Sequence, residues 1–175
     1  MRAERAEWAN AYARQARCDW RMFELLLGQD NVPVAQVLHY LQMSSEKIAK
    51  SYRLTASTLT LEELRATHVI FAKAFSTWLD SPFGQPLLGR LHDIKAAKQV
   101  YRLLARETEL LAPSSDASST PQNVEYPWEA RDDAGRPVVR VPCDERFAIE
   151  RVLDPQDRVG FHFLKLLREM ITRPE

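Results

Sequence analysis

The segment VAQVLHYLQMSSEKIAKSY, residues 34–52, constrains the fold more than any other part of the chain. Its apolar or small residues recur at alternating steps of four and three, which places them on one face of a helix. They are Val34, Leu38, Leu41, Ser45, Ile48 and Tyr52. Asn31 can cap this helix, and Pro33 suits its start. A helix with such a face must bury it, so the other elements are expected to pack around this segment.

A first helix is predicted for residues 3–27. Gly28 follows it and suits a left-handed cap, because glycine has no Cβ to clash in that conformation. The connection to the central helix, residues 28–32, is short. Two helices joined by so few residues are expected to lie side by side and antiparallel.

Two further helices are predicted after residue 52. Thr60 and Glu63 have the spacing of a capping box, so a third helix should begin near residue 61 and run to about residue 79. The next segment, residues 80–91, contains two prolines and two glycines and is interpreted as a loop. A fourth helix should then span residues 93–112, where Pro113 ends it.

The last third of the chain changes character. Residues 113–123 are rich in Ser and Pro and predict a mobile linker, whereas residues 124–175 predict a short hairpin and a final helix packed on the same bundle. Asp154 and Pro155 suit the start of that helix, which should end near Thr172. The sequence therefore predicts an all-α fold, an antiparallel up-down bundle of four main helices plus a C-terminal fifth, with a short β-hairpin. We expect residues 1–112 to form the bundle of a single domain.

Composition limits the classes of function. The 175 residues carry 24 Lys and Arg against 24 Asp and Glu, so bulk charge does not attract nucleic acid and any RNA contact must come from a local patch. Neither a signal-peptide core nor an apolar run of membrane-spanning length is found, so we expect a cytoplasmic protein without a membrane. The four histidines and two cysteines show no metal-ligand spacing, and no phosphate-binding loop is present. We expect no cofactor and no metal.

His68 falls on the predicted inner face of the third helix, together with Leu64, Phe71, Phe75 and Trp78. A histidine on an apolar face is usually a packed residue with one ring nitrogen hydrogen-bonded to a neighbour. The alternative is a ligand-binding or catalytic imidazole, with Glu46 or Lys47 of the central helix as its partner. The sequence leaves both interpretations open.

Two other groups of side chains are candidate ligand-binding residues. A basic stripe on the fourth helix can track a phosphate backbone or form a solvated face. It consists of Lys95, Lys98, Arg102 and Arg106. Tyr126 and Trp128 flank a proline and can stack on a base or cap the open end of the bundle.

The run HYLQMSSEKIAKSY and the later run THVIFAKAF resemble the second and third helices of the HEPN family, the higher eukaryotes and prokaryotes nucleotide-binding domains. The resemblance covers residues 8–112 as a pattern of helices. It is sharpest at Gln42, Met43, Glu46, Lys47, Thr67 and His68. It implies a small helical bundle of the kind found in prokaryotic toxin-antitoxin and antiviral defence systems. The implied partners are a nucleotide or RNA, a protein from a neighbouring gene, and a second copy in a homodimer.

Enzymatic HEPN proteins pair an arginine with a histidine and cleave RNA without metal. Histidine can move the proton of a ribose hydroxyl, and arginine can stabilise charge on phosphate. All Arg/His pairs in this chain have shorter spacings than that motif. They are Arg90 and His92, Arg65 and His68, and Arg158 and His162.

Of these pairs, Arg158 and His162 come closest to the motif, because residues four apart share one helical face. They lie, however, outside the region of resemblance. We therefore predict a non-catalytic binding module for a nucleotide, RNA or a protein partner. A metal-independent ribonuclease that uses Arg158 and His162, or His68, is the alternative, and a structural assembly subunit is a third hypothesis.

Overall fold

The computed structural model describes residues 4–56, 59–89, 93–113 and 122–173. Most of the predicted linker, residues 114–121, and both members of the Arg90 and His92 pair lie outside these ranges. The helices are α1 (Arg5–Leu27), α2 (Val34–Ala56), α3 (Leu61–Ala66), α4 (Phe71–Leu79), α5 (Gln85–Leu88), α6 (Ile94–Glu109) and α7 (Arg158–Thr172). Two strands, β1 (Trp128–Arg131) and β2 (Pro137–Arg140), and two short 3₁₀ helices, η1 (Pro142–Asp144) and η2 (Ala148–Leu153), complete the described chain.

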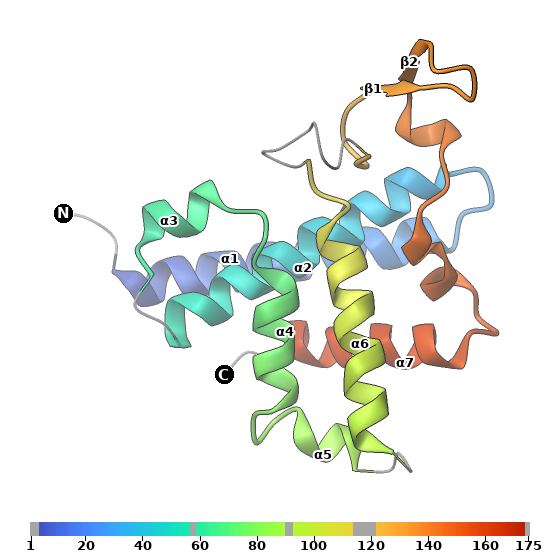
Figure 1. Ribbon diagram of the computed structural model, residues 1–175. Helices are drawn as coiled ribbons and strands as arrows, with labels where there is room; N and C mark the ends of the chain where they lie inside the picture. Colours follow the sequence, from blue (N-terminus) through green and yellow to red (C-terminus); the bar gives the residue numbers. More distant parts are fainter. Residues whose placement is uncertain (1–3, 57–58, 90–92, 114–121, 174–175) are drawn as a thin grey trace.

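The helices form two antiparallel pairs that cross. In Figure 1, α1 and α2 run side by side in opposite directions, as the short connection between them predicts. The second pair, α4 and α6, crosses the first, and α7 lies beneath the crossing against α1 and α2. The predicted helical bundle with a short hairpin is therefore confirmed.

The core forms where the two pairs and α7 meet. Leu38 and Leu41 of α2 are fully buried, as the periodicity of residues 34–52 predicts. Phe75 of α4 packs between two other aromatic rings, with its ring centroid 5.4 Å from that of Phe163 and 5.9 Å from that of Trp78. Buried aromatic side chains contribute a large apolar area, so this cluster fixes α4 and α7 against each other.

The prediction of one continuous third helix is wrong. It begins with the expected capping box of Thr60 and Glu63, but it ends at Ala66, and a new helix starts at Phe71. The intervening residues include Thr67, Val69 and Ile70, whose β-branched side chains are stiff and lower helix propensity. Because the helix breaks here, the residues between α3 and α4 do not lie on the helical face predicted for a continuous helix.

Two predicted helix ends are also wrong. Gly28 has a φ of −87°, so it does not adopt the left-handed conformation that its position suggested. The last helix begins at Arg158 and is capped by the Asp157 carboxylate, which accepts hydrogen bonds from the N–H groups of Val159 and Gly160. Asp154 was expected to cap it. The chain instead forms the 3₁₀ helix η2 just before that position, which delays the start of α7.

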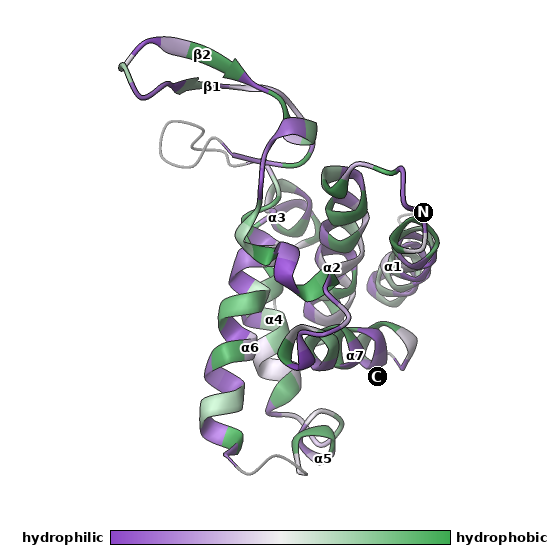
Figure 2. Ribbon diagram, turned by 90° about the vertical axis from the view of Figure 1, so that its right-hand side faces the viewer, coloured by the Kyte–Doolittle hydropathy of each residue, from purple (hydrophilic) through white to green (hydrophobic). Residues whose placement is uncertain are grey.

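The hairpin projects from the bundle, as both Figure 1 and Figure 2 show. Its strands pair antiparallel with Trp128 opposite Arg140 and Arg131 opposite Pro137. Gly135, with a φ of 75°, turns the chain between them, as a residue without a Cβ can do at little cost. The hairpin was predicted, but its projection into solvent has no local signal in the sequence.

Candidate functional site

The most connected group of polar side chains surrounds Glu46 on α2. Its Oε1 lies 2.6 Å from Nζ of Lys50, and its Oε2 accepts a hydrogen bond from Nε2 of Gln42 at 2.9 Å. Nδ1 of His68 lies 2.9 Å from the same Oε2. Glu46, Gln42 and Lys50 are all buried. We call these four residues the Glu46 cluster; it ties the middle of α2 to the turn between α3 and α4.

Glu46 is held in its ionised form. Burial by itself raises the pKa of a carboxyl group, because it penalises the charged state. Hydrogen bonds from Lys50 and His68, the charge of Lys50, and the hydrogen bond from Gln42 act in the opposite direction. Their combined effect exceeds that of burial and lowers the pKa of Glu46 below its ordinary value of 4.5.

His68 does not lie on an apolar inner face, so that prediction is wrong. The break between α3 and α4 places it in the connecting turn, with 52% of its side chain exposed. The predicted contact with Glu46 is present. Lys47, the other predicted partner, points elsewhere: its Nζ lies 2.8 Å from Oδ2 of Asp19 on α1. Adjacent residues of α2 therefore serve two different ion pairs.

The basic stripe of α6 is largely neutralised by neighbouring carboxylates. Asp80, at the C-terminal end of α4, lies 2.5 Å from Nζ of Lys98 and 3.3 Å from Nη2 of Arg102. Arg106 pairs with Glu109 at 2.7 Å. For Lys95, the described residues include no carboxylate within ion-pair distance. Asp80 and Glu109 reduce the positive potential that the stripe offers to a phosphate backbone.

The structure gives His162 a partner that the sequence did not suggest. Its Nδ1 lies 2.5 Å from the hydroxyl of Tyr101 on α6. Burial lowers the pKa of His162 below 6.5, the charge of Lys165 lowers it further, and burial raises the pKa of Tyr101. A neutral imidazole is therefore favoured at neutral pH. Arg158 lies one helical turn earlier on α7 and is exposed.

The aromatic pair of the hairpin does not cap the bundle. Tyr126 is 60% exposed, and Trp128 lies half-buried in the first strand of the projecting hairpin. Val139, on the paired strand, is 73% exposed. The capping hypothesis is therefore wrong for Tyr126, whose ring stays accessible.

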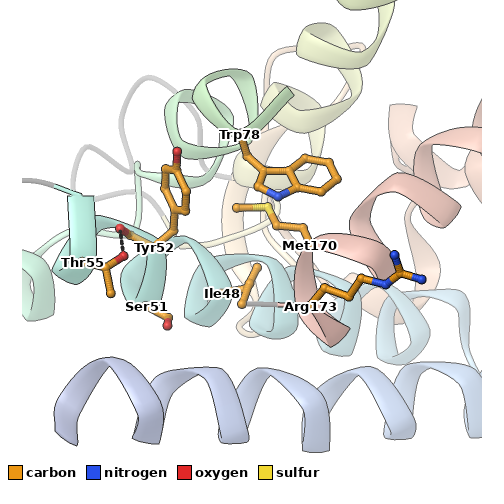
Figure 3. A pocket seen from close by; sticks show the side chains of 7 residues that line it. All are labelled: Ile48, Ser51, Tyr52, Thr55, Trp78, Met170 and Arg173. Atoms are coloured by element: carbon orange, nitrogen blue, oxygen red, sulfur yellow. Dashed lines mark hydrogen bonds between the residues drawn. The ribbon is translucent and has the colours of Figure 1, made fainter. Parts of the chain in front are cut away.

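A small crevice lies between α2, α4 and α7. Figure 3 shows Trp78 and Met170 side by side within it, with the guanidinium of Arg173 turned away. The space left inside is about 20 Å³. A volume of that size accommodates about one water molecule. The crevice is therefore a packing defect and is too small for an organic ligand.

The sequence analysis named Gln42 and Glu46 but missed Lys50, Asp80 and Tyr101, for two reasons. Gln42, Glu46 and Lys50 follow one another at four-residue steps, so the ladder on α2 was present in the sequence as a helical spacing. Asp80 and Tyr101, in contrast, meet their partners only through the packing of separate elements. The spacing of residues along the chain gave no signal for these contacts.

Comparisons with protein-family models, with curated proteins and with solved structures gave no match. The HEPN resemblance therefore remains a hypothesis that depends on the motif around residues 42–47. Within the described ranges, no cluster of three His, Cys, Asp or Glu side chains is arranged to hold a metal ion. None of the helices described is both long and apolar enough to span a bilayer.

Proposed function

We propose that this chain is a non-catalytic, HEPN-like binding module that assembles with a second copy of itself through α1 and α7. The observation that carries the proposal is an open groove between these helices, with a volume of about 440 Å³. Leu27 and Phe161 line it and are 42% and 63% exposed. Apolar side chains gathered around an open groove are typical of an interaction surface.

Two features favour a second copy as the occupant. The groove is lined by two carboxylates, Glu24 and Glu169, and by two cations, Lys165 and Arg168, so its charges balance. Arg168 pairs with Glu24 at 3.5 Å, and Glu169 pairs with Arg173 at 3.0 Å. Lys165 is therefore the cation that a two-fold axis can place against a carboxylate of the other copy. Phe161 projects from the same surface, so each copy offers both a hollow and a side chain to fill it.

Replacing Phe161 with Ser is expected to shift the assembly toward monomer. The substitution removes an exposed apolar side chain, and burial of a phenylalanine contributes about 1.5 to 3 kcal/mol per copy. Sedimentation velocity over a concentration series measures the dimer fraction. Val139→Ser on the hairpin is the matched control, because it changes an exposed apolar residue far from the groove. A wild-type monomer at every concentration, or an unchanged dimer in Phe161→Ser, would contradict the proposal.

The further partners of such a module are a nucleotide, RNA or a protein encoded by a neighbouring gene, within a prokaryotic defence or toxin-antitoxin assembly in the cytoplasm. Support for the compartment comes from Cys18 and Cys143, which are both exposed free thiols. Exposed free thiols are typical of a reducing compartment. The binding role is proposed from the HEPN resemblance as a whole. Glu46 and Lys47 are not its contacts, because both are occupied by intramolecular ion pairs.

A metal-independent ribonuclease is the second candidate function, favoured by the neutral His162 beside Tyr101 and by Arg158 one turn away. A non-catalytic module is expected to leave RNA intact in the presence of a chelator. Gel analysis of a labelled RNA measures the fraction that is cleaved. Cleavage that is lost in His162→Gln and kept in His68→Gln would establish the enzymatic alternative, provided that both variants melt like the wild type.

A further inference from the structure

A second hollow, distinct from the groove between α1 and α7, lies where three elements meet at the other end of α1. It is lined by Arg5 and Trp8 of α1, Leu54 of α2, and Thr60, Leu61, Glu62 and Arg65 at or within α3. These elements come together close to the N-terminal end of the described chain in Figure 1. The volume is about 620 Å³. Ligand sites in proteins usually measure about 300 to 1,000 Å³, so the hollow is large enough for an organic molecule.

Arg65 is the residue that points to a ligand. The carbon at the centre of its guanidinium lies 4.3 Å from the ring centroid of Trp8, so a cation–π contact fixes the head group. None of the carboxylates in the described part of the chain lies within ion-pair distance of it. An aromatic ring holds the cation in place without neutralising its charge. The N–H groups on the edge of the guanidinium therefore suit an anion, which they can bind in a bidentate manner.

Arg5 fixes another part of the lining. Its Nε donates to the carbonyl oxygen of Leu54 at 2.5 Å, and its Nη1 donates to that of Leu59 at 2.6 Å. These bonds satisfy carbonyl groups at and beyond the last turn of α2, which have no partner within the helix. A ligand therefore meets a wall whose geometry is already set, and preorganisation reduces the entropic cost of binding.

The remaining lining residues select the class of ligand. Leu54 and Leu61 offer apolar surface against which a flat ring can lie, and burial of that surface stabilises the contact. Glu62 adds a carboxylate that accepts hydrogen bonds from hydroxyl or amino groups. A bare inorganic anion would leave both features unused. A molecule with a phosphate, a sugar hydroxyl and a planar base uses all of them.

We propose that this hollow binds a nucleoside monophosphate, with the phosphate on Arg65 and the base against Leu54 and Leu61. The nucleotide can be a free molecule or the 5′-phosphorylated end of an RNA, since both present the same groups. This inference rests on the proposed function, which names a nucleotide among the partners of the module, and it assigns that partner a site. The site shares no lining residue with the groove proposed for assembly, so nucleotide binding and assembly are tested separately.

Isothermal titration calorimetry of the full chain with AMP, GMP and UMP tests the proposal. At least one of them is expected to bind more tightly than its nucleoside and more tightly than inorganic phosphate. Arg65→Gln should weaken binding roughly tenfold to a hundredfold, because a charge-assisted hydrogen-bond pair is lost. Arg65→Lys keeps the charge but cannot form two parallel hydrogen bonds to the phosphate. Its affinity should lie between those of the wild type and Arg65→Gln. Arg14→Gln, an exposed arginine of α1 outside the hollow, is the matched control.

Short RNAs with a 5′-phosphate or a 5′-hydroxyl identify the source of the nucleotide. Tighter binding of the phosphorylated RNA than of the free nucleotide supports an RNA end, and equal binding supports the free nucleotide. Absence of binding by all of these probes at millimolar concentration would overturn the proposal. Equal affinity in wild type and in an Arg65→Gln variant with unchanged thermal melting would also overturn it. Phe161→Ser should leave nucleotide binding unchanged, which separates this site from assembly.

Discussion

Replacing Glu46 with Ala is expected to lower the free energy of unfolding by about 3 to 5 kcal/mol, because breaking a buried ion pair leaves an uncompensated charge. The side chain of Lys50 is only 6% exposed, and Glu46 is its carboxylate partner at 2.6 Å. The substitution also removes the acceptor of Gln42 and the partner of His68. The turn between α3 and α4 thereby loses its polar attachment to α2.

Denaturant unfolding followed by circular dichroism measures this loss. Glu129→Ala, which removes an exposed glutamate from the hairpin, is the control and should change stability by less than about 0.5 kcal/mol. A double substitution, Glu46→Met with Lys50→Met, should recover most of the loss, because apolar residues of similar volume often replace a buried ion pair at little cost. Wild-type stability in Glu46→Ala would show that the pair is not buried in solution.

The same ion pair makes stability depend on pH. The pKa of Glu46 is lower in the folded chain than its ordinary value of 4.5, so the unfolded chain takes up the proton first as the pH falls. The stabilisation is therefore complete well above pH 4.5 and is lost as the pH falls from there toward the folded pKa. In Glu46→Gln, the slope of unfolding free energy against pH should decrease within that window.

Replacing Gly160 with Ala is expected to destabilise the protein by about 1 to 3 kcal/mol, the usual cost of overpacking a filled core. Helix propensity alone predicts the opposite sign, a gain of about 1 kcal/mol, since glycine is a poor helix former. A Cβ at Gly160 would lie 2.6 Å from Cα of Val152 and 3.3 Å from the carbonyl oxygen of Arg151. Both contacts are with the backbone of η2, so relief requires a shift of that segment or of α7.

Gly28→Ala separates the effect of helix propensity from the effect of overpacking. The Cβ at Gly28 would meet its nearest atom, the carbonyl oxygen of Leu25, at 3.8 Å, and the residue has a negative φ. This substitution should therefore be neutral or slightly stabilising. Thermal melting of both variants is the measurement. An increased melting temperature for Gly160→Ala would mean that η2 does not pack closely on α7.

Much of the helical fold could be predicted from local patterns. The face of α2 that buries Leu38, Leu41 and Ile48 follows from a spacing of three and four residues. The capping box at Thr60 was identified from residue types at a fixed offset.

The errors arose where two local signals competed. The predicted face of the third helix continued from Leu64 through His68 to Phe71, but the β-branched residues Thr67, Val69 and Ile70 favour a break there. Asp154 and Asp157 both suit a helix cap, and the 3₁₀ helix before Asp154 decided between them. Sequence patterns do not weigh such alternatives, because the difference between them is set by packing against the rest of the chain.

The sequence by itself determined which faces of the helices are apolar, where the hairpin turns, and the ladder of Gln42, Glu46 and Lys50 on one side of α2. These properties depend on residues a few positions apart, whose relative placement is fixed by helix or turn geometry. Only the tertiary structure decided that Asp80 neutralises the basic stripe, that Tyr101 holds His162, and that Arg65 stacks on Trp8 beside an open hollow. Each of these contacts joins separate elements, and the packing of the core sets the distance between them.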